Sequence, residues 1–156
     1  MNATPDNQRT IAGLTEHYGS AYKWYVTATV MLGTFSVVLA ATIINVAVPA
    51  IMGRFDVAQD EVHWLATGFL AAMTVGMLLN AWAVARYGSR HGFALAMAGF
   101  IVASLIGGFS GDFGVLVGAR ALQGLTAGMI QPHALIAIFQ VFPVHRRGQA
   151  MGIYGM

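Results

Sequence analysis

Long apolar stretches, separated by short charged loops, occupy most of this sequence. They are Trp24–Ile51, Val62–Val84, Gly92–Gly111 and Gly114–Val141. A helix of about 20 apolar residues spans the roughly 30 Å hydrocarbon core of a bilayer, and each stretch reaches that length. The one charged residue inside them is Arg120. We therefore expect an all-α membrane protein, a polytopic helix bundle with four transmembrane helices and the start of a fifth.

The composition favours the same class. Of the 156 residues, 57% are hydrophobic and 9% are charged, whereas soluble domains carry about 25% charged residues. So few charges cannot cover a water-facing surface, and we expect a lipid bilayer to contact much of the chain. The net charge of +2 does not indicate a nucleic acid partner. Without cysteine, and with five scattered histidines, the sequence predicts no metal site and no cofactor.

The distribution of basic residues predicts how the chain threads the membrane, because cytoplasmic loops carry an excess of Lys and Arg. Basic residues precede the first stretch and follow the second and the fourth. The other two connections are mainly acidic, with Arg54 as their one basic residue. We expect residues 1–23 to be a cytoplasmic tail and residues 24–156 to form the transmembrane part. The basic flanks contain Arg9, Lys23, Arg86, Arg90, Arg146 and Arg147.

Arg120 is the most informative polar residue, because a charge within a membrane helix is costly and usually faces a cavity or a partner. Gln123 lies near it in sequence, and Gly124 one turn on leaves space beside it. Thr42 and Asn45 in the first stretch, together with Gln123 and Gly124 in the fourth, are candidates for lining a substrate cavity. The simpler alternatives are that the Arg120 side chain snorkels to the headgroups and that Asn45 only joins two helices.

Enzyme activity has little support in this sequence. It shows no Ser/His/Asp grouping, no phosphate-binding glycine loop and no HExxH segment, and none of the four stretches contains Asp or Glu. His133, which follows Pro132, could titrate, but a packing role is the simpler interpretation. We expect a membrane protein that is not an enzyme.

Glycines spaced four residues apart recur along the sequence. Small residues at this spacing let helix backbones approach closely within lipid. We expect these faces to pack closely against other helices, and they could also slide during transport. The pairs are Gly107/Gly111, Gly114/Gly118, Gly124/Gly128 and Gly148/Gly152.

Three segments carry motifs beyond plain hydrophobicity. They are LAATIINVAVP at residues 39–49, ARYGSR at residues 85–90 and LVGARALQG at residues 116–124. They resemble the first-span, loop and fourth-span signatures of the major facilitator superfamily, and most closely those of its drug/proton antiporter branch with fourteen spans. Trp64 and residues 147–152 also fit. The resemblance extends over residues 24–156 and implies the N-terminal part of a major facilitator fold.

For the complete transporter, the resemblance implies efflux of hydrophobic or cationic small molecules across the bacterial inner membrane in exchange for protons. A periplasmic adaptor protein is a candidate partner. Arg120 matches the arginine that the family links to the proton pathway. Gly88, flanked by Arg86 and Arg90, matches the turn of the gating loop between the second and third spans.

Two positions depart from the signatures of the branch. Ala40 and Ala85 stand where acidic residues are usual, so the proton-handling and charge-network roles of those carboxylates do not carry over. Members of the family have twelve or fourteen spans and bind substrate between two halves. We therefore expect a partial protein that does not transport alone. Two alternatives stay open, a facilitator for another solute and a small membrane module that does not transport.

Overall fold

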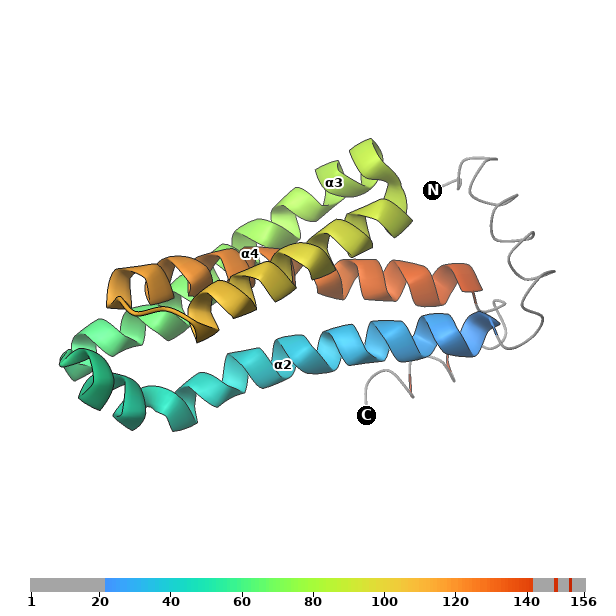
Figure 1. Cartoon of the computed structure of the whole chain (residues 1–156). Coiled ribbons are helices and arrows are strands. Elements are labelled where there is room, and N and C mark those ends of the chain that lie inside the picture. The colour runs from blue at the N-terminus through green and yellow to red at the C-terminus, as the bar shows by residue number, and fades with distance from the viewer. Residues whose placement is uncertain (1–21, 142–147, 149–151, 153–156) are drawn as a thin grey trace. The chain divides into compact units, whose positions relative to one another are not determined.

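The structure is a computed structural model that describes residues 22–141, Gly148 and Gly152. The described part is helical, with α2 at Tyr22–Phe55, α3 at Gln59–Gly108 and α4 at Phe113–Val141 (Figure 1). The predicted tail and the predicted start of a fifth helix lie largely outside these residues. Gly33–Ala134 forms one compact unit, and the flanking parts of α2 and α4 belong to another. The contacts described below lie within Gly33–Ala134.

The helix count differs from the sequence prediction, because the described residues form three long helices where four spans and the start of a fifth were expected. The difference lies in α3, which has 50 residues. A straight helix of that length would extend about 75 Å, more than twice the roughly 30 Å hydrocarbon core. Gly88 interrupts α3 with φ 75° and ψ 161°, a conformation that glycine adopts without a Cβ clash. Figure 1 shows that α3 turns back on itself.

The first limb of α3, before Gly88, packs against α4 with backbone nearly touching backbone. A Cβ on Gly124 would collide with the carbonyl of Phe69, and one on Gly128 would collide with the carbonyl of Met73. The contact advances along both helices in the same direction, so this limb runs parallel to α4. Close packing is thus confirmed for the pair Gly124/Gly128.

The second limb of α3 packs against α4 in the opposite direction. A Cβ on Gly92 would collide with the ring of His133, and one on Gly99 would lie 2.7 Å from the side chain of Thr126. As residue numbers increase along this limb, the numbers of the α4 residues that they contact decrease. Since the first limb is parallel to α4 and the second is antiparallel, the two limbs of α3 are antiparallel to each other.

Not every small-residue pair packs against a helix. A Cβ on Gly118 or on Gly111 would meet nothing within 4 Å among the described residues, and one on Gly114 would meet only the nearby side chain of Asp112. Close packing is therefore not found for Gly114/Gly118 among the described residues, and for this pair it stays a prediction.

The core joins all four helical runs. Its buried cluster consists of Val37, Phe69, Ala96, Phe100, Ala127 and Ile130, and three methionines, Met73, Met97 and Met129, pack against it. Large apolar side chains also cover the outside, for example Val46, which is 82% exposed, and Leu78, which is 76% exposed. All three helices are long and apolar enough to cross a membrane.

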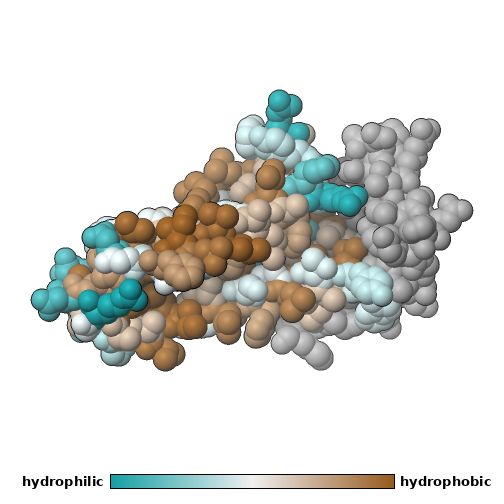
Figure 2. All heavy atoms as spheres, viewed as in Figure 1, coloured by the Kyte–Doolittle hydropathy of each residue, from teal (hydrophilic) through white to brown (hydrophobic). Residues whose placement is uncertain are grey.

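The exposed charged residues lie at the ends of this apolar surface. Figure 2 shows hydrophobic spheres over the middle of the helices and hydrophilic ones where α2 meets α3 and where α3 turns back. An exposed apolar band between polar ends is the arrangement that a bilayer solvates, since lipid removes the penalty that water imposes on apolar surface.

Local hydrogen bonds end one helix and begin the next. After Phe55, Asp56 has a φ of 52° and turns the chain. At the start of α3, the side chain of Glu61 accepts a hydrogen bond of 3.0 Å from the amide of Ala58. At the start of α4, Asp112 Oδ1 accepts one of 3.1 Å from the amide of Val115. Both carboxylates lie at helix N-termini, where the helix dipole favours negative charge.

Candidate functional site

Arg120 lies inside the helix bundle. Its side chain is only 7% exposed. Nη1 donates hydrogen bonds to the carbonyl of Ala40 on α2, at 3.1 Å, and to Gln123 Oε1 one turn along α4, at 2.6 Å. Because the head group is buried between helices rather than reaching toward an end of the bundle, snorkelling is wrong as an account of Arg120.

A chain of hydrogen bonds continues from Arg120 through Gln123 to α3. Gln123 Nε2 donates to Ser104 Oγ at 2.7 Å, and Ser104 Oγ donates to the carbonyl of Phe100 at 2.7 Å. Gln123 is 8% exposed, and a buried amide requires both an acceptor and a donor partner. Here it accepts from Arg120 and donates to Ser104, so the network fixes the orientation of the amide.

The guanidinium of Arg120 also stacks on an aromatic ring of the first limb of α3. Its central carbon lies 4.4 Å from the centroid of Phe69, which is 1% exposed. A cation over an aromatic face stabilises by about 2 kcal/mol when both groups are desolvated. Arg120 therefore contacts α2, α4 and the first limb of α3 directly, and it reaches the second limb through Gln123.

Part of the guanidinium has no partner. Nε and Nη2 of Arg120 are buried and make no hydrogen bond within the described part of the chain. The only Asp and Glu residues there are Asp56, Asp60, Glu61 and Asp112, which lie outside the predicted apolar stretches. The site is thus a buried cation with three hydrogen-bond donors left over, two on Nη2 and one on Nε.

The structure gathers only some of the predicted site residues. Arg120 and Gln123 are bonded to each other, whereas Gly124 packs against the backbone of Phe69. Thr42 lies on the exposed side of α2, where its hydroxyl donates to the carbonyl of Val38 at 3.0 Å. Asn45 is exposed on the same helix. A role for Thr42, Asn45, Gln123 and Gly124 in a substrate cavity stays a prediction.

The predicted gating-loop residues lie where α3 reverses. Gly88 carries the non-helical conformation, and Arg86 and Arg90 on either side are exposed. Trp82 and Tyr87 contact edge to face, with ring centroids 5.9 Å apart, at the end of the first limb. The geometry is that of a tight turn with its charges outward; gating is a dynamic property and stays a prediction.

Sequence reasoning missed two polar residues, Ser104 and Asn80, and gave His133 a packing role. Ser104 is the partner of Gln123, and Asn80 and His133 are buried with Oδ1 and Nε2 unpartnered. His133 Nδ1 lies 2.8 Å from the carbonyl of Met129 and donates to it. A polar residue in an apolar stretch was the one available signal, since its partner depends on helix register. Among the described residues, no group of three His, Asp or Glu is arranged to hold a metal ion.

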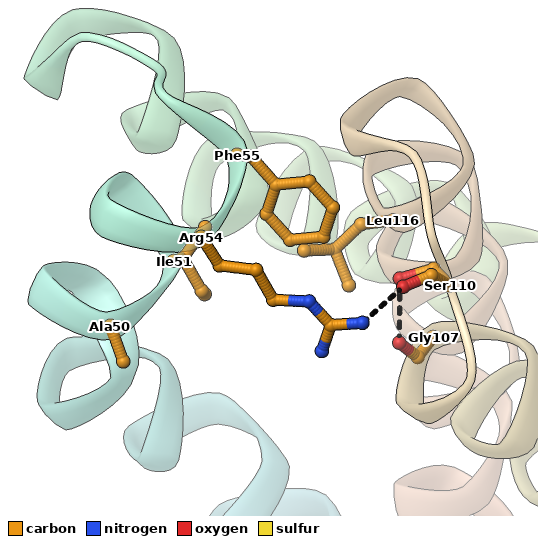
Figure 3. Close-up of a pocket in the computed structure, with 7 residues that line it drawn as sticks. All are labelled: Ala50, Ile51, Arg54, Phe55, Gly107, Ser110 and Leu116. Carbon is orange, nitrogen blue, oxygen red and sulfur yellow. Dashed lines mark hydrogen bonds between the residues drawn. The ribbon is translucent and has the colours of Figure 1, made fainter.

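A second arginine, Arg54, contacts the turn between α3 and α4 at one end of the bundle. Arg54 Nη2 donates to the carbonyl of Ser110 at 3.2 Å, beside a pocket of about 250 Å³ between the end of α2 and the α3–α4 turn (Figure 3). Small-molecule sites usually have about 300–1,000 Å³. Because the pocket is smaller than this range and Arg54 is exposed, we interpret the hydrogen bond from Arg54 to Ser110 as a structural contact that joins the end of α2 to the α3–α4 turn.

Comparison with known proteins agrees with this geometry. The family model described as Major Facilitator Superfamily matches residues 30–156. An MFS-type transporter of Mycobacterium tuberculosis is 35% identical over 140 residues, which cover 88% of this chain and 24% of the relative. A puromycin resistance protein of Streptomyces alboniger is 34% identical, over 85% of this chain and 27% of the relative.

A fatty acid resistance protein of Neisseria gonorrhoeae is also 35% identical, over 88% of this chain and 27% of the relative. The chain thus spans about a quarter of the length of these curated relatives, between 24% and 27% of each. The resemblance seen in the sequence motifs is confirmed, and the relatives are transport and resistance proteins rather than enzymes. The chain belongs to the Major Facilitator Superfamily of membrane transporters.

Proposed function

We propose that the complete protein is a secondary transporter that exports hydrophobic small molecules across the bacterial inner membrane in exchange for protons. The observation that carries this proposal is the buried guanidinium of Arg120, which connects α2, both limbs of α3 and α4. A charge held among membrane helices is costly and is usually retained for a function. Major facilitators place such groups near the substrate path between two halves of the fold.

The relatives leave the chemistry of the cargo open. Their names refer to puromycin in one case and to fatty acids in another. The hydrophobic part of the proposed cargo is supported by the apolar, methionine-containing core of Gly33–Ala134, since methionine adapts to differently shaped apolar partners. A cationic cargo, proton exchange and a periplasmic adaptor protein stay predictions that depend on the complete protein.

The transport proposal is tested in inverted membrane vesicles that contain the full-length protein. A hydrophobic fluorescent dye should accumulate when a proton gradient is imposed, and a protonophore should abolish the accumulation. Vesicles from cells without the gene are the control. Accumulation that ignores the protonophore would contradict proton exchange, and its complete absence for drugs, sugars and organic acids alike would contradict transport.

We further propose that the chain crosses the bilayer four times before a fifth helix begins. The spans are α2, the two antiparallel limbs of α3, and α4. Arg86 and Arg90 at the reversal of α3 favour a cytoplasmic turn, and the acidic α2–α3 connection favours the outside. The N-terminus, residues 1–23, would then be cytoplasmic.

The absence of cysteine makes this topology directly testable. We expect a single cysteine introduced by Asp112→Cys to react with a membrane-impermeant maleimide added to intact cells. One introduced by Arg90→Cys should react only after the cells are opened. If both positions label in intact cells, α3 does not cross the membrane twice, and the proposed four spans are wrong.

A further inference from the structure

Arg120 offers more hydrogen-bond donors than its neighbours use. A guanidinium has five N–H groups. The two on Nη1 are directed to Ala40 and Gln123, and the three on Nε and Nη2 are buried without an acceptor. Buried donors and buried charges are normally paired, because an unpaired one forfeits its hydration. The unused N–H groups on Nε and Nη2 of Arg120 are therefore the feature of this bundle that most clearly indicates a binding site for a hydrogen-bond acceptor.

These unused donors lie on one edge of the guanidinium. One N–H of Nη2 runs parallel to the N–H of Nε, and this fork matches the two oxygens of a carboxylate. The edge is held in place, because Nη1 is anchored on two sides and the ring of Phe69 covers one face. A preorganised edge of this kind loses little side-chain freedom when an anion binds.

No side chain in the middle of the bundle can supply that carboxylate. Ala40, whose carbonyl accepts from Nη1, carries only a methyl group, which packs against the apolar cluster around Phe69. Asp112 directly precedes α4 and lies eight residues from Arg120, or about 12 Å along the axis, and its side chain already caps α4 at Val115. The positive charge is thus uncompensated within the described helices.

We infer that the Nε/Nη2 edge of Arg120 binds the carboxylate of an amphipathic monocarboxylate, with the hydrocarbon part of the ligand against the apolar cluster around Phe69. This inference deepens the proposed transport function, on which it rests for the ligand being cargo. Met73, Met97 and Met129 border that cluster, and their flexible thioethers can repack around a chain. The edge is covered in this structure, so binding requires α2, α3 and α4 to separate locally around Arg120.

The site also predicts an order of headgroup preference. An unpaired guanidinium attracts an anion strongly, forms only an ordinary hydrogen bond with a neutral hydroxyl and repels a cation, and the charge effects are larger in a medium of low dielectric than in water. Among ligands with the same hydrocarbon chain, we expect a carboxylate to bind most tightly and a quaternary ammonium most weakly.

The experiment measures equilibrium binding of radiolabelled dodecanoate to the purified full-length protein in nanodiscs at pH 8, where a carboxylic acid is ionised. Dodecanol and dodecyltrimethylammonium serve as competitors with the same chain. We expect dodecanoate to bind at least ~10-fold more tightly than dodecanol, and Arg120→Gln to weaken dodecanoate about 10- to 100-fold, as expected for a lost charge-assisted pair. Dodecanol should change less than about twofold in that variant, since it lacks the charge that Arg120 would pair.

Ala40→Asp provides a second and independent variant. It places a carboxylate on the residue that already contacts Arg120, so it should compete with the ligand and weaken dodecanoate by at least ~10-fold while Arg120 is intact. Arg54→Gln is the matched control, because it removes an arginine from the end of the bundle, and it should leave dodecanoate binding unchanged. If Arg120→Gln does not fold, Arg120→Lys replaces it as the test variant, because lysine retains the charge but lacks the paired N–H groups. Ala40→Asp then remains an independent test of whether dodecanoate binds at the Nε/Nη2 edge.

Equal affinities for dodecanoate and dodecanol would overturn the inference, as would dodecanoate binding that is insensitive to both Arg120→Gln and Ala40→Asp. The two proposals fail separately. Dye transport without selective dodecanoate binding would refute the carboxylate site and leave the transport function. Selective binding without transport of any compound would refute the transport function and leave the site.

Discussion

Proton-driven dye accumulation should fall at least ~10-fold when Arg120 is replaced by methionine, while the protein stays as stable as the parent or becomes more stable. Arg120 contacts α2, α4 and the first limb of α3 together, and its loss removes the only Asp, Glu, Lys or Arg side chain that is buried among the described residues. Replacing a buried ion pair by apolar residues of similar volume is often neutral or stabilising by about 1–4 kcal/mol, and Arg120 lacks, among the described residues, even the partner charge that would offset its desolvation. Transport rate in vesicles and thermal melting in detergent measure the two effects.

The combination of lost activity with retained stability separates a functional arginine from a structural one. Arg120→Lys keeps the charge but not the planar fork, and we expect it to retain part of the activity. Arg54→Met is the matched control, because Arg54 is exposed and contacts the end of the bundle. If Arg120→Met transports normally, or if it unfolds, the guanidinium serves packing rather than transport.

The largest loss of stability is expected at Gly128. Replacing it by valine would drive a side chain into the carbonyl of Met73 on the first limb of α3. The clash is with helix backbone, which cannot move aside by changing rotamer as a flexible side chain can. Overpacking a core usually costs about 1–3 kcal/mol, and we expect this change to lie at or above the upper end of that range. The melting temperature in detergent and the yield of monodisperse protein are the measurements.

Gly118→Val on the same helix is the control for the change at Gly128. A Cβ at Gly118 meets nothing within 4 Å among the described residues, and an exposed helix position tolerates valine with an intrinsic penalty below about 1 kcal/mol. We expect this variant to melt within a few degrees of the parent. Equal losses at both positions would mean that helix propensity, rather than the α3–α4 contact, sets the effect.

The helices themselves could be predicted from the sequence to within a few residues. The stretch expected at Trp24–Ile51 became α2 at Tyr22–Phe55, and the one expected at Gly114–Val141 became α4 at Phe113–Val141. This works because the information is local. The length and apolar character that a bilayer requires are visible in a short window of sequence.

The turn between the two middle stretches was predicted as a loop at residues 85–90, and the structure needs only one non-helical residue, Gly88, to make it. Its neighbours keep helical conformations, which is why the count of three helices differs from the expected four spans. A positive φ at a single glycine is invisible to hydrophobic periodicity, since it changes the direction of the chain without changing the pattern.

The site was predictable in part. Gln123 lies three residues from Arg120, a spacing that places both on one face of a helix, and the structure joins them. The contacts with Ala40 and Ser104 could not be predicted, because they depend on the rotation and register of α2 and α3 against α4. The same uncertainty explains why Thr42 and Asn45, chosen for polarity alone, are on the exposed side of α2.

By itself, the sequence determined that this is a membrane protein, the approximate limits of its helices, its family and the presence of one charged residue, Arg120, within an apolar stretch. Each of these follows from the type and order of residues along a single segment. Only the tertiary structure decided which glycines allow backbones to touch, where α3 reverses, and that Arg120 has a free, preorganised edge. Those features arise between helices far apart in the chain, and packing geometry alone selects among the registers that the hydrophobic pattern permits.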